Sequence, residues 1–211
     1  MKRYGEHRFP GRLFVVEGID GSGKSTMVTH IANELRRRGR SALRTREPGG
    51  TSISEQIRTL LLDTKNVAMV PFTELFLYMA SRAQLVDEVI RPSIAKGVDV
   101  VCDRYYYSTA AYQGAAGKVG IATVIAIAEK IARFQKPDVV LLLDLNPELA
   151  RSRDGIRDDR VENKGLEYQK KVRAGFLKLA RRDPRRVKVI DASRPAEQVF
   201  ADVMKAVDRA L

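Results

Sequence analysis

The segment EGIDGSGKST, residues 17–26, constrains the fold of this chain more than any other stretch of its sequence. Gly18 to Ser25 fit the pattern G-x-x-x-x-G-K-[ST], and the apolar run Leu13 to Val16 stands before them. In this pattern a strand turns into a helix, and backbone N–H groups together with the helix N-terminus hold a phosphate. We therefore expect a strand, a phosphate loop, a helix and a bound nucleotide. The alternative is a glycine-rich turn without a ligand.

The rest of the chain alternates short apolar runs with longer segments of helical periodicity, which predicts an α/β fold with a parallel sheet. The predicted strands are Leu13 to Glu17, Ala42 to Arg46, Val98 to Asp103, Val139 to Asp144 and Val187 to Asp191. The predicted helices are Lys24 to Arg38, Ser54 to Leu62, Phe72 to Lys96, Ile121 to Phe134, Gly165 to Arg182 and Pro195 to Leu211.

The length and composition suit one globular domain over residues 1–211, preceded by a basic leader at residues 1–12. The longest apolar runs are too short to cross a bilayer, and the start lacks the apolar centre of a signal peptide. We therefore expect a cytoplasmic protein without a membrane partner. The single cysteine, Cys102, excludes a disulfide framework within one chain and is expected to be a small buried residue.

The charge of the chain suits an anionic partner, because 38 Lys and Arg face 26 Asp and Glu, a formal net charge of +12. The basic residues occur in short groups separated by acids, and no group is interleaved with aromatic residues as a platform for single-stranded nucleic acid would be. We interpret these groups as solvated helix faces and expect no nucleic-acid partner.

Polar residues follow all five predicted strands, and the carboxyl ends of parallel strands meet at one edge of a sheet. In the phosphate loop, Lys24 is expected to reach the β- and γ-phosphates and the Ser25 hydroxyl to complete the shell of a Mg²⁺ ion. Asp103, at the end of a buried strand, is the second expected metal ligand. The residues expected to bind the donor nucleotide at the loop are Gly18, Ile19, Asp20, Gly21, Ser22, Gly23, Lys24, Ser25 and Thr26.

Five motifs together resemble thymidylate kinase, in order and spacing, over nearly the whole chain from Leu13 onward. They are EGIDGSGKST, TREPGGT (residues 45–51), SRAQLV (81–86), DRYYYSTAAYQG (103–114) and LDLNPELARSR (143–153). The resemblance implies a P-loop nucleoside-monophosphate kinase fold with three layers, a five-stranded parallel sheet flanked by helices, and a mobile lid. It also implies a homodimer that makes dTDP from dTMP and ATP with Mg²⁺.

The motif DRYYYSTAAYQG supplies much of the acceptor site. Arg104 can clamp a phosphate with its planar fork of donors, and the resemblance assigns it the dTMP phosphate. The resemblance further implies that Thr109, with Ser108 beside it, faces the pyrimidine edge near N3. Tyr112 would pack where a ribose 2′-hydroxyl would go, and Arg46 would bind the acceptor phosphate. For the tyrosines the alternative is ordinary packing of a loop, and for Arg46 a plain surface turn.

Tyr78 and Arg82 are four residues apart on a predicted helix and therefore share a face. By resemblance they stack on the thymine ring and bind its O4. The family commonly has Phe where this chain has Tyr78, which adds a hydroxyl that needs a partner. The alternative is that Tyr78 packs in the core beside Leu75, Phe76 and Met79.

The phosphate loop contains an acid, Asp20, and no arginine, although phosphoryl transfer needs cations around the developing charge. The lid, about residues 151–165, holds several arginines and is expected to be a mobile loop or a frayed helix pair. By resemblance Arg153 covers the adenine, and Arg157 and Arg160 meet the transferring group, the choice between them being open. Asp20 is expected to turn away from the phosphates and accept a hydrogen bond from the deoxyribose 3′-hydroxyl.

Two other functions fit parts of the sequence. One is a kinase for another deoxynucleotide, because Tyr78 departs from the family pattern. The other is a P-loop NTPase with a regulatory role or a nucleic-acid dependence, which would need neither the Tyr78 and Arg82 pair nor the motif DRYYYSTAAYQG.

Overall fold

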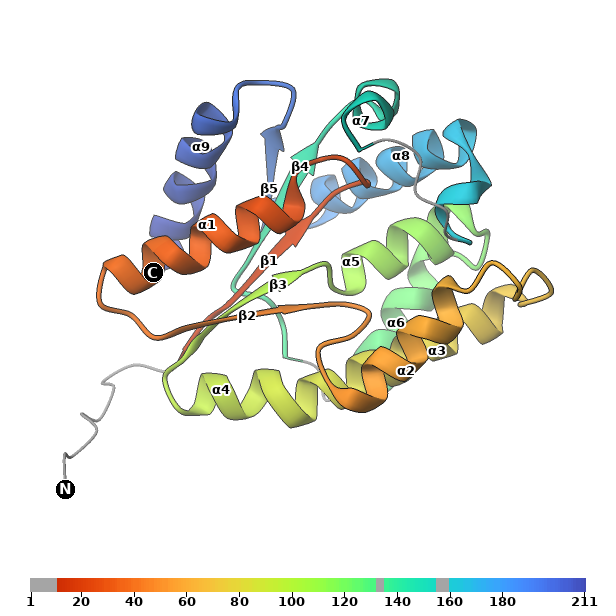
Figure 1. Cartoon of the computed structure of the whole chain (residues 1–211), viewed down its shortest axis with the longest axis horizontal. Coiled ribbons are helices and arrows are strands. Elements are labelled where there is room, and N and C mark those ends of the chain that lie inside the picture. The colour runs from red at the N-terminus through yellow and green to blue at the C-terminus, as the bar shows by residue number, and fades with distance from the viewer. Residues whose placement is uncertain (1–10, 132–134, 155–159) are drawn as a thin grey trace.

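The computed structural model describes residues 11–131, 135–154 and 160–211, and its centre is a parallel sheet of five strands (Figure 1). The strand order is β2-β3-β1-β4-β5, and every neighbouring pair is parallel. The strands are β1 (Leu13–Glu17), β2 (Ala42–Arg46), β3 (Asp99–Asp103), β4 (Val139–Asp144) and β5 (Val187–Asp191). The predicted sheet is confirmed, and only β3 differs in its bounds, because it begins at Asp99 instead of Val98.

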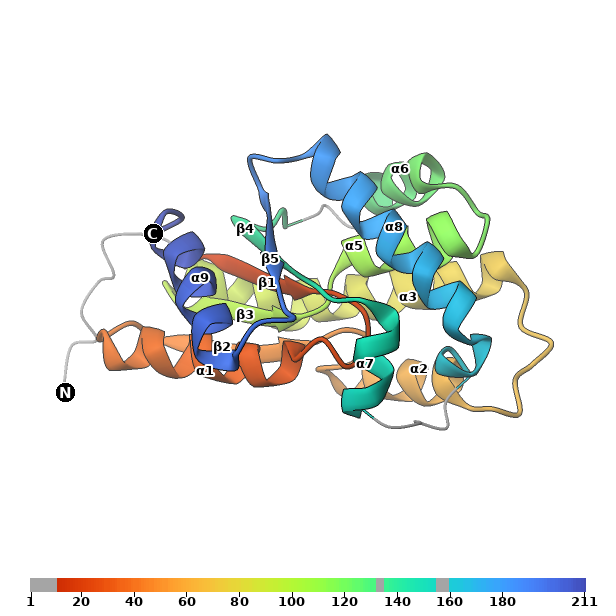
Figure 2. The ribbon, with the colours of Figure 1, turned by 90° about the horizontal axis from the view of Figure 1, so that it is seen from above.

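Helices complete a three-layer α/β fold. The helices α1 (Lys24–Arg37) and α9 (Ala196–Asp208) pack on one side of the sheet, and α8 (Leu166–Arg182) packs on β4 and β5 from the other (Figure 2). The helix α4 (Arg91–Ala95) contacts β3. To the right of the sheet in Figure 1 lie α2 (Ser52–Leu62), α3 (Pro71–Leu85), α5 (Tyr106–Thr109), α6 (Ile121–Ile131) and α7 (Pro147–Asp154).

The order of the strands follows from their sequences. The central strands β1, β3 and β4 are nearly continuous apolar runs, as strands covered on both faces must be. The edge strand β2, with the sequence ALRTR, is only partly buried. Nearly all buried apolar residues of the described chain form one cluster around the central strands. Cys102 on β3 is buried and free, as predicted.

The predicted helix from Phe72 to Lys96 is present but not uniform. A π-helical segment, Val86–Ile90, separates α3 from α4. Pro92 explains the change, because its ring nitrogen has no N–H to give to the carbonyl four residues earlier. The wider turn keeps the chain helical up to Ala95.

Two parts of the chain differ from the sequence-based expectation or add to it. The motif DRYYYSTAAYQG, to which no element was assigned, forms α5 and a π-helical segment, Ala110–Ala116. The first residues of the predicted lid, up to Asp154, belong to α7, and Glu162–Lys164 forms a 3₁₀ turn. Residues 155–159 and residues 1–10 of the basic leader lie outside the described part. In the described ranges no helix has the length and apolar character needed to cross a membrane.

Candidate active site

The phosphate loop joins β1 to α1, as its pattern predicts. Lys24, the first residue of α1, places its ammonium group 2.7 Å from the carbonyl of Ile19 and 3.7 Å from Asp20 Oδ1. Gly21 has a φ of 76°, and a Cβ there would lie 2.4 Å from the carbonyl oxygen of Ala150 on α7. The loop can therefore pass under α7 only because position 21 has no side chain.

A cavity opens beside this loop. Half of its lining residues belong to the phosphate loop, and basic side chains from four other segments join them. The lining comprises Asp20, Gly21, Gly23, Lys24, Ser25, Thr26, Arg46, Glu47, Arg58, Asp103, Arg104 and Arg153. The side chains of Ile19 and Ser22 are buried instead, and the Ser22 hydroxyl has no hydrogen-bond partner. If Gly18, Ile19 and Ser22 contact a nucleotide, they therefore do so through their backbone atoms.

The two expected metal ligands lie together at the edge of this cavity. The Ser25 hydroxyl donates a hydrogen bond to Asp103 Oδ2 at 2.7 Å. One carboxylate and one hydroxyl are a small set of ligands, but they match Mg²⁺, which takes its remaining oxygens from water and phosphates. Among the residues that the structure describes, no cluster of three or more His, Cys, Asp or Glu offers a site built from protein alone.

Arg104 follows β3 with a φ of 67°, a left-handed conformation that is costly for a residue with a side chain. Its Nη1 donates to the carbonyl of Gly18 at 2.9 Å and to Ser108 Oγ at 3.1 Å, and its Nη2 pairs with Asp20 Oδ1. Its guanidinium carbon also lies 5.2 Å from the centre of the Tyr112 ring. These contacts fix the Arg104 side chain against the phosphate loop.

The contacts of Asp20 explain an acid in a phosphate loop. Its second oxygen, Oδ2, accepts a hydrogen bond from the Tyr112 hydroxyl at 3.1 Å. Burial by itself would raise the pKa of Asp20, but the charges of Arg104 and Lys24 outweigh burial and hold the pKa below its usual range. The carboxylate is therefore ionised and is directed toward Arg104 and Tyr112.

A second cavity lies beyond Asp20, among residues of α2, α3 and α5. It gathers the residues that the resemblance assigned to the acceptor base and sugar, together with several that the sequence did not single out. Its lining comprises Asp20, Glu47, Pro48, Arg58, Leu62, Tyr78, Arg82, Arg104, Tyr105, Ser108, Thr109, Tyr112, Gln113 and Val161. Tyr78 lies here, whereas Leu75 and Met79 of its helix join the core.

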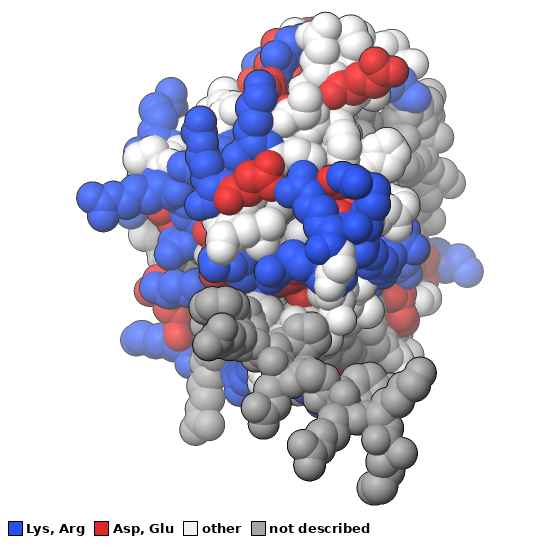
Figure 3. All heavy atoms as spheres, turned by 90° about the vertical axis from the view of Figure 1, so that its left-hand side faces the viewer, with Lys and Arg blue, Asp and Glu red and all other residues white. Residues whose placement is uncertain are grey.

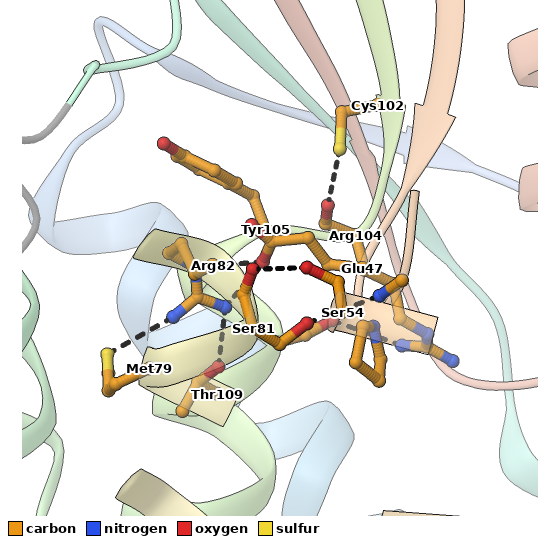
Figure 4. Close-up of polar contacts among 12 residues, drawn as sticks. Glu47, Ser54, Met79, Ser81, Arg82, Cys102, Arg104, Tyr105 and Thr109 are labelled. Carbon is orange, nitrogen blue, oxygen red and sulfur yellow. Dashed lines mark hydrogen bonds and ion pairs between the residues drawn. The ribbon is translucent and has the colours of Figure 1, made fainter. Parts of the chain in front are cut away.

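Arg82 is a buried charge of this cavity and is held by several partners. Its guanidinium is buried and pairs with Glu47 Oε2 at 2.6 Å (Figure 4). It also donates to Thr109 Oγ1 at 2.9 Å and to Met79 Sδ at 3.3 Å. A buried cation is costly unless it is paired and hydrogen-bonded, so these contacts fix the orientation of the Arg82 guanidinium. Tyr105 packs against it, with its ring centre 5.3 Å from the guanidinium carbon.

The two cavities share Asp20, Glu47, Arg58 and Arg104. Sequence reasoning gave Arg58 no role. A signal was present, because Arg58 shares a helix face with Ser54 and Leu61, at spacings of four and three, and both of those residues are buried. Its Nη1 donates to the carbonyl of Pro48 at 3.0 Å, which turns it toward the site. Gln113 was also missed, and it lies in the π-helical segment after α5.

The remaining arginines lie at different distances from this junction. Arg46 lines the loop cavity and pairs with Glu55 at 2.9 Å. Arg153 lines the same cavity and donates to the carbonyl of Ala192 at 2.8 Å. Arg160 lines a third cavity instead, where it pairs with Glu74 at 2.6 Å. Arg157 lies outside the described residues.

A family model described as thymidylate kinase matches residues 16–203. The thymidylate kinase of Symbiobacterium thermophilum is 44% identical over 196 residues, which cover 92% of this chain and 92% of that protein. The thymidylate kinase of Desulfosudis oleivorans is 42% identical over 206 residues, which cover 93% and 96%.

A crystal structure of thymidylate kinase from Ehrlichia chaffeensis superimposes with a TM-score of 0.78 at 28% sequence identity. The match covers 94% of this chain and 100% of that one. The family model and the relatives cover nearly all of the chain, and the phosphate loop and the acceptor motifs lie within the matched residues. The chain therefore belongs to the thymidylate kinase family.

Proposed function

We propose that this chain transfers the γ-phosphoryl group of ATP to dTMP and produces dTDP and ADP, with Mg²⁺ as the metal. The observation that carries the proposal is the pair of cavities that meet at Asp20, Arg58 and Arg104. One cavity is built from a phosphate loop and the other from a tyrosine and a buried arginine. Two such cavities with shared basic residues suit a reaction in which a phosphoryl group passes from one nucleotide to another.

On the donor side, the N–H groups of the loop and the Lys24 ammonium bind the β- and γ-phosphates. Ser25 and Asp103 hold the Mg²⁺ ion, which supplies neutralising charge to the phosphate oxygens. Arg153 covers the adenine, and its bond to the carbonyl of Ala192 supports this role by fixing the guanidinium at the edge of the cavity.

On the acceptor side, Tyr78 stacks on the thymine ring and Arg82 binds its O4, while Ser108 and Thr109 lie at the pyrimidine edge. The buried pair with Glu47 supports the role of Arg82, because it leaves the guanidinium little freedom to reorient. The remaining acceptor residues are assigned to the sugar and phosphate: Asp20 accepts from the 3′-hydroxyl, Tyr112 excludes a 2′-hydroxyl, and Arg46 and Arg104 bind the phosphate.

The remaining parts of the proposal concern the lid and the assembly. Arg157 and Arg160 are the candidates for the transferring phosphoryl group. The chain forms one domain that assembles as a homodimer, and it works in the cytoplasm without nucleic-acid or membrane partners. The mass of the protein in solution tests the dimer.

A coupled assay of ADP release, with dTMP, dUMP, dCMP, dGMP and UMP as acceptors, tests the proposed activity. The proposal predicts a strong dependence on dTMP and weak use of UMP, because Tyr112, which lines the second cavity, is assigned to exclude a 2′-hydroxyl. ADP release without any acceptor would favour an NTPase, and preference for another deoxynucleotide would favour a different kinase of the same class.

A further inference from the structure

Glu17 is a carboxylate without exposed surface at the end of β1, one residue before the phosphate loop. Its Oε1 accepts the backbone N–H of Tyr105 at 2.8 Å and that of Ser108 at 3.1 Å. Its Oε2 accepts the hydroxyl of Ser108 at 2.5 Å. Because a buried carboxylate is costly unless it is hydrogen-bonded, these three bonds couple β1 to the segment that follows β3.

The hydrogen bond from the Tyr105 N–H to Glu17 stabilises the backbone on the C-terminal side of Arg104. The N–H of Arg104 donates to the carbonyl of Val16 at 2.9 Å, and Cys102 Sγ donates to the carbonyl of Arg104 at 3.0 Å (Figure 4). The next N–H along the chain, that of Tyr105, donates to Glu17. Arg104 has the left-handed φ that glycine adopts most readily, so the conformation persists only because both flanking peptides are held.

The bond to the Ser108 hydroxyl orients the side chain of Arg104. A guanidinium can only donate, so Ser108 Oγ must offer a lone pair to Arg104 Nη1, 3.1 Å away. The hydroxyl proton points to Glu17, which leaves the lone pairs of the oxygen free for Arg104. The bonds therefore run in one direction, from Arg104 to Ser108 and from Ser108 to Glu17.

We propose that Glu17 is a positioning residue that presents Arg104 to the acceptor phosphate, through the hydroxyl of Ser108 and the peptide of Tyr105. The inference rests on the proposed function, in which Arg104 binds the phosphate of dTMP. Glu17 is fully buried and acts through these neighbours. This role moves Ser108 to the phosphate end of the acceptor and leaves Thr109 alone at the pyrimidine edge, where the proposed function had placed both residues.

Thymidine, which differs from dTMP only by the phosphate, gives a direct test. The dissociation constants of dTMP and thymidine are measured by calorimetry at pH 8, where Glu17 is ionised because its pKa is about 7, for the wild type, Glu17→Gln, Ser108→Ala and the double variant. In Glu17→Gln the amide keeps an oxygen for the two N–H groups, but its nitrogen donates to Ser108 and turns the hydroxyl proton toward Arg104. We expect dTMP to bind about tenfold more weakly to each single variant, with thymidine changed less than about twofold. Both substitutions interrupt the same chain of hydrogen bonds from Arg104 through Ser108 to Glu17. The double variant should therefore lose no more dTMP affinity than either single variant.

Asp99→Asn is the matched control. Asp99 is also a fully buried carboxylate on a strand, it accepts the backbone N–H of Arg12 at 3.0 Å and it pairs with Arg40. It lies at the opposite end of β3 from Arg104, so its substitution should leave the ratio of the two dissociation constants unchanged.

The outcomes separate this inference from the proposed function. A wild-type protein that binds dTMP no more tightly than thymidine would refute the proposed function itself. If the wild type prefers dTMP and both single variants keep that preference, Glu17 does not position Arg104. Equal weakening of dTMP and thymidine by Ser108→Ala would also overturn the inference, because Ser108 would then contact the nucleoside. Ser108→Ala leaves Glu17 on its two backbone donors, so the test stands even if Glu17→Gln does not fold.

Discussion

Asp20 brings a negative charge into a loop that binds phosphates, and its neighbours explain why the charge is tolerated. Its two oxygens are bonded to Arg104 and Tyr112, and Lys24 lies 3.7 Å away. The carboxylate thus faces groups assigned to the acceptor, while the backbone of the loop remains available to the donor. In the proposed function, the two ends of this loop therefore serve two different substrates.

Asp20→Ala should therefore impair the use of dTMP far more than that of ATP. We expect KM for dTMP to rise by about tenfold or more, because Asp20 bonds Arg104 and is proposed to bind the acceptor sugar, while KM for ATP changes little. Initial rates with each substrate varied in turn measure both constants. Asp20→Asn, which keeps the shape without the charge, is the matched variant. An equal loss toward both substrates would contradict the assignment.

Glu17 predicts a pH dependence of stability. Burial raises its pKa from an ordinary 4.5 to about 7, and the Ser108 hydroxyl and the Arg104 charge offset only part of that rise. Between these values the folded protein binds a proton that the unfolded chain has released. The contribution of Glu17 to stability therefore falls as the pH rises from 4.5 through 7.

Glu17→Gln does not titrate, so its free energy of unfolding should rise relative to that of the wild type between pH 5 and pH 8. The expected rise is about 2.5 kcal/mol, because a pKa change from 4.5 to about 7 corresponds to about 3.4 kcal/mol and most of it falls between pH 5 and pH 8. Urea unfolding at both pH values measures the difference. A difference that stays constant with pH would show that Glu17 has an ordinary pKa in the folded protein.

The residues of the phosphate loop were predictable because a spaced pattern of Gly, Lys and Ser reports the chemistry directly. The role of Ser108 was not, because the direction of its hydroxyl depends on Glu17, 91 positions away. Arg58 was missed although it shares a helix face with Ser54 and Leu61, because the sequence does not show that this face of α2 borders both cavities. The roles of all these residues stay predictions until they are substituted.

At the scale of elements, the strands were predictable because apolar runs between polar turns have few other interpretations. The π-helical segments, Val86–Ile90 and Ala110–Ala116, were not, because a wide helical turn leaves no separate periodicity in a sequence. The second segment places Tyr112 and Gln113 at the second cavity. Single π-helical turns within helices are frequently found at functional sites.

The lid arginines Arg157 and Arg160 can be tested by substitution. Arg160 pairs with Glu74, and Glu74 also accepts from Gln113 at 2.6 Å and from Lys164 at 3.3 Å. If Arg157 and Arg160 serve the transferring phosphoryl group, substitution of both by Ala should lower kcat by about a hundredfold or more and leave dTMP affinity nearly intact. Single-turnover rates and dTMP titrations measure the two effects.

Glu74→Gln is the control that separates two roles of Arg160. If Arg160 acts on the phosphoryl group, the Arg160→Ala variant should have a lower kcat and the Glu74→Gln variant should keep most of its kcat. If it anchors the lid through the pair with Glu74, both variants should lose the same share of turnover. Unchanged turnover in the double arginine variant would refute the role of the lid arginines altogether.

At the scale of the whole molecule, the excess of positive charge does not lie only at the site. Figure 3 shows Lys and Arg spread over the face at the left of Figure 1, where α1 ends and which lies away from the phosphate loop. Arg37 and Arg38 on this face pair with Glu34, and Arg38 also pairs with Asp208. These pairs fit the interpretation of solvated helix faces, and the absence of a nucleic-acid partner stays a prediction.

The fold could be predicted as a whole because a phosphate loop fixes one strand, one helix and the edge where ligands gather. The two adjoining cavities could not, because their shape depends on side chains from α2, α3, α5 and the end of the lid. The family supplied what the pattern alone left open, namely the identity of the acceptor.

The most direct test of the account is to incubate the protein with ATP, Mg²⁺ and dTMP and to quantify dTDP and ADP separately by chromatography. The two cavities that meet at Arg104 predict one dTDP for each ADP and almost no ADP when dTMP is omitted. ADP that accumulates without an equal amount of dTDP would contradict transfer between two bound nucleotides.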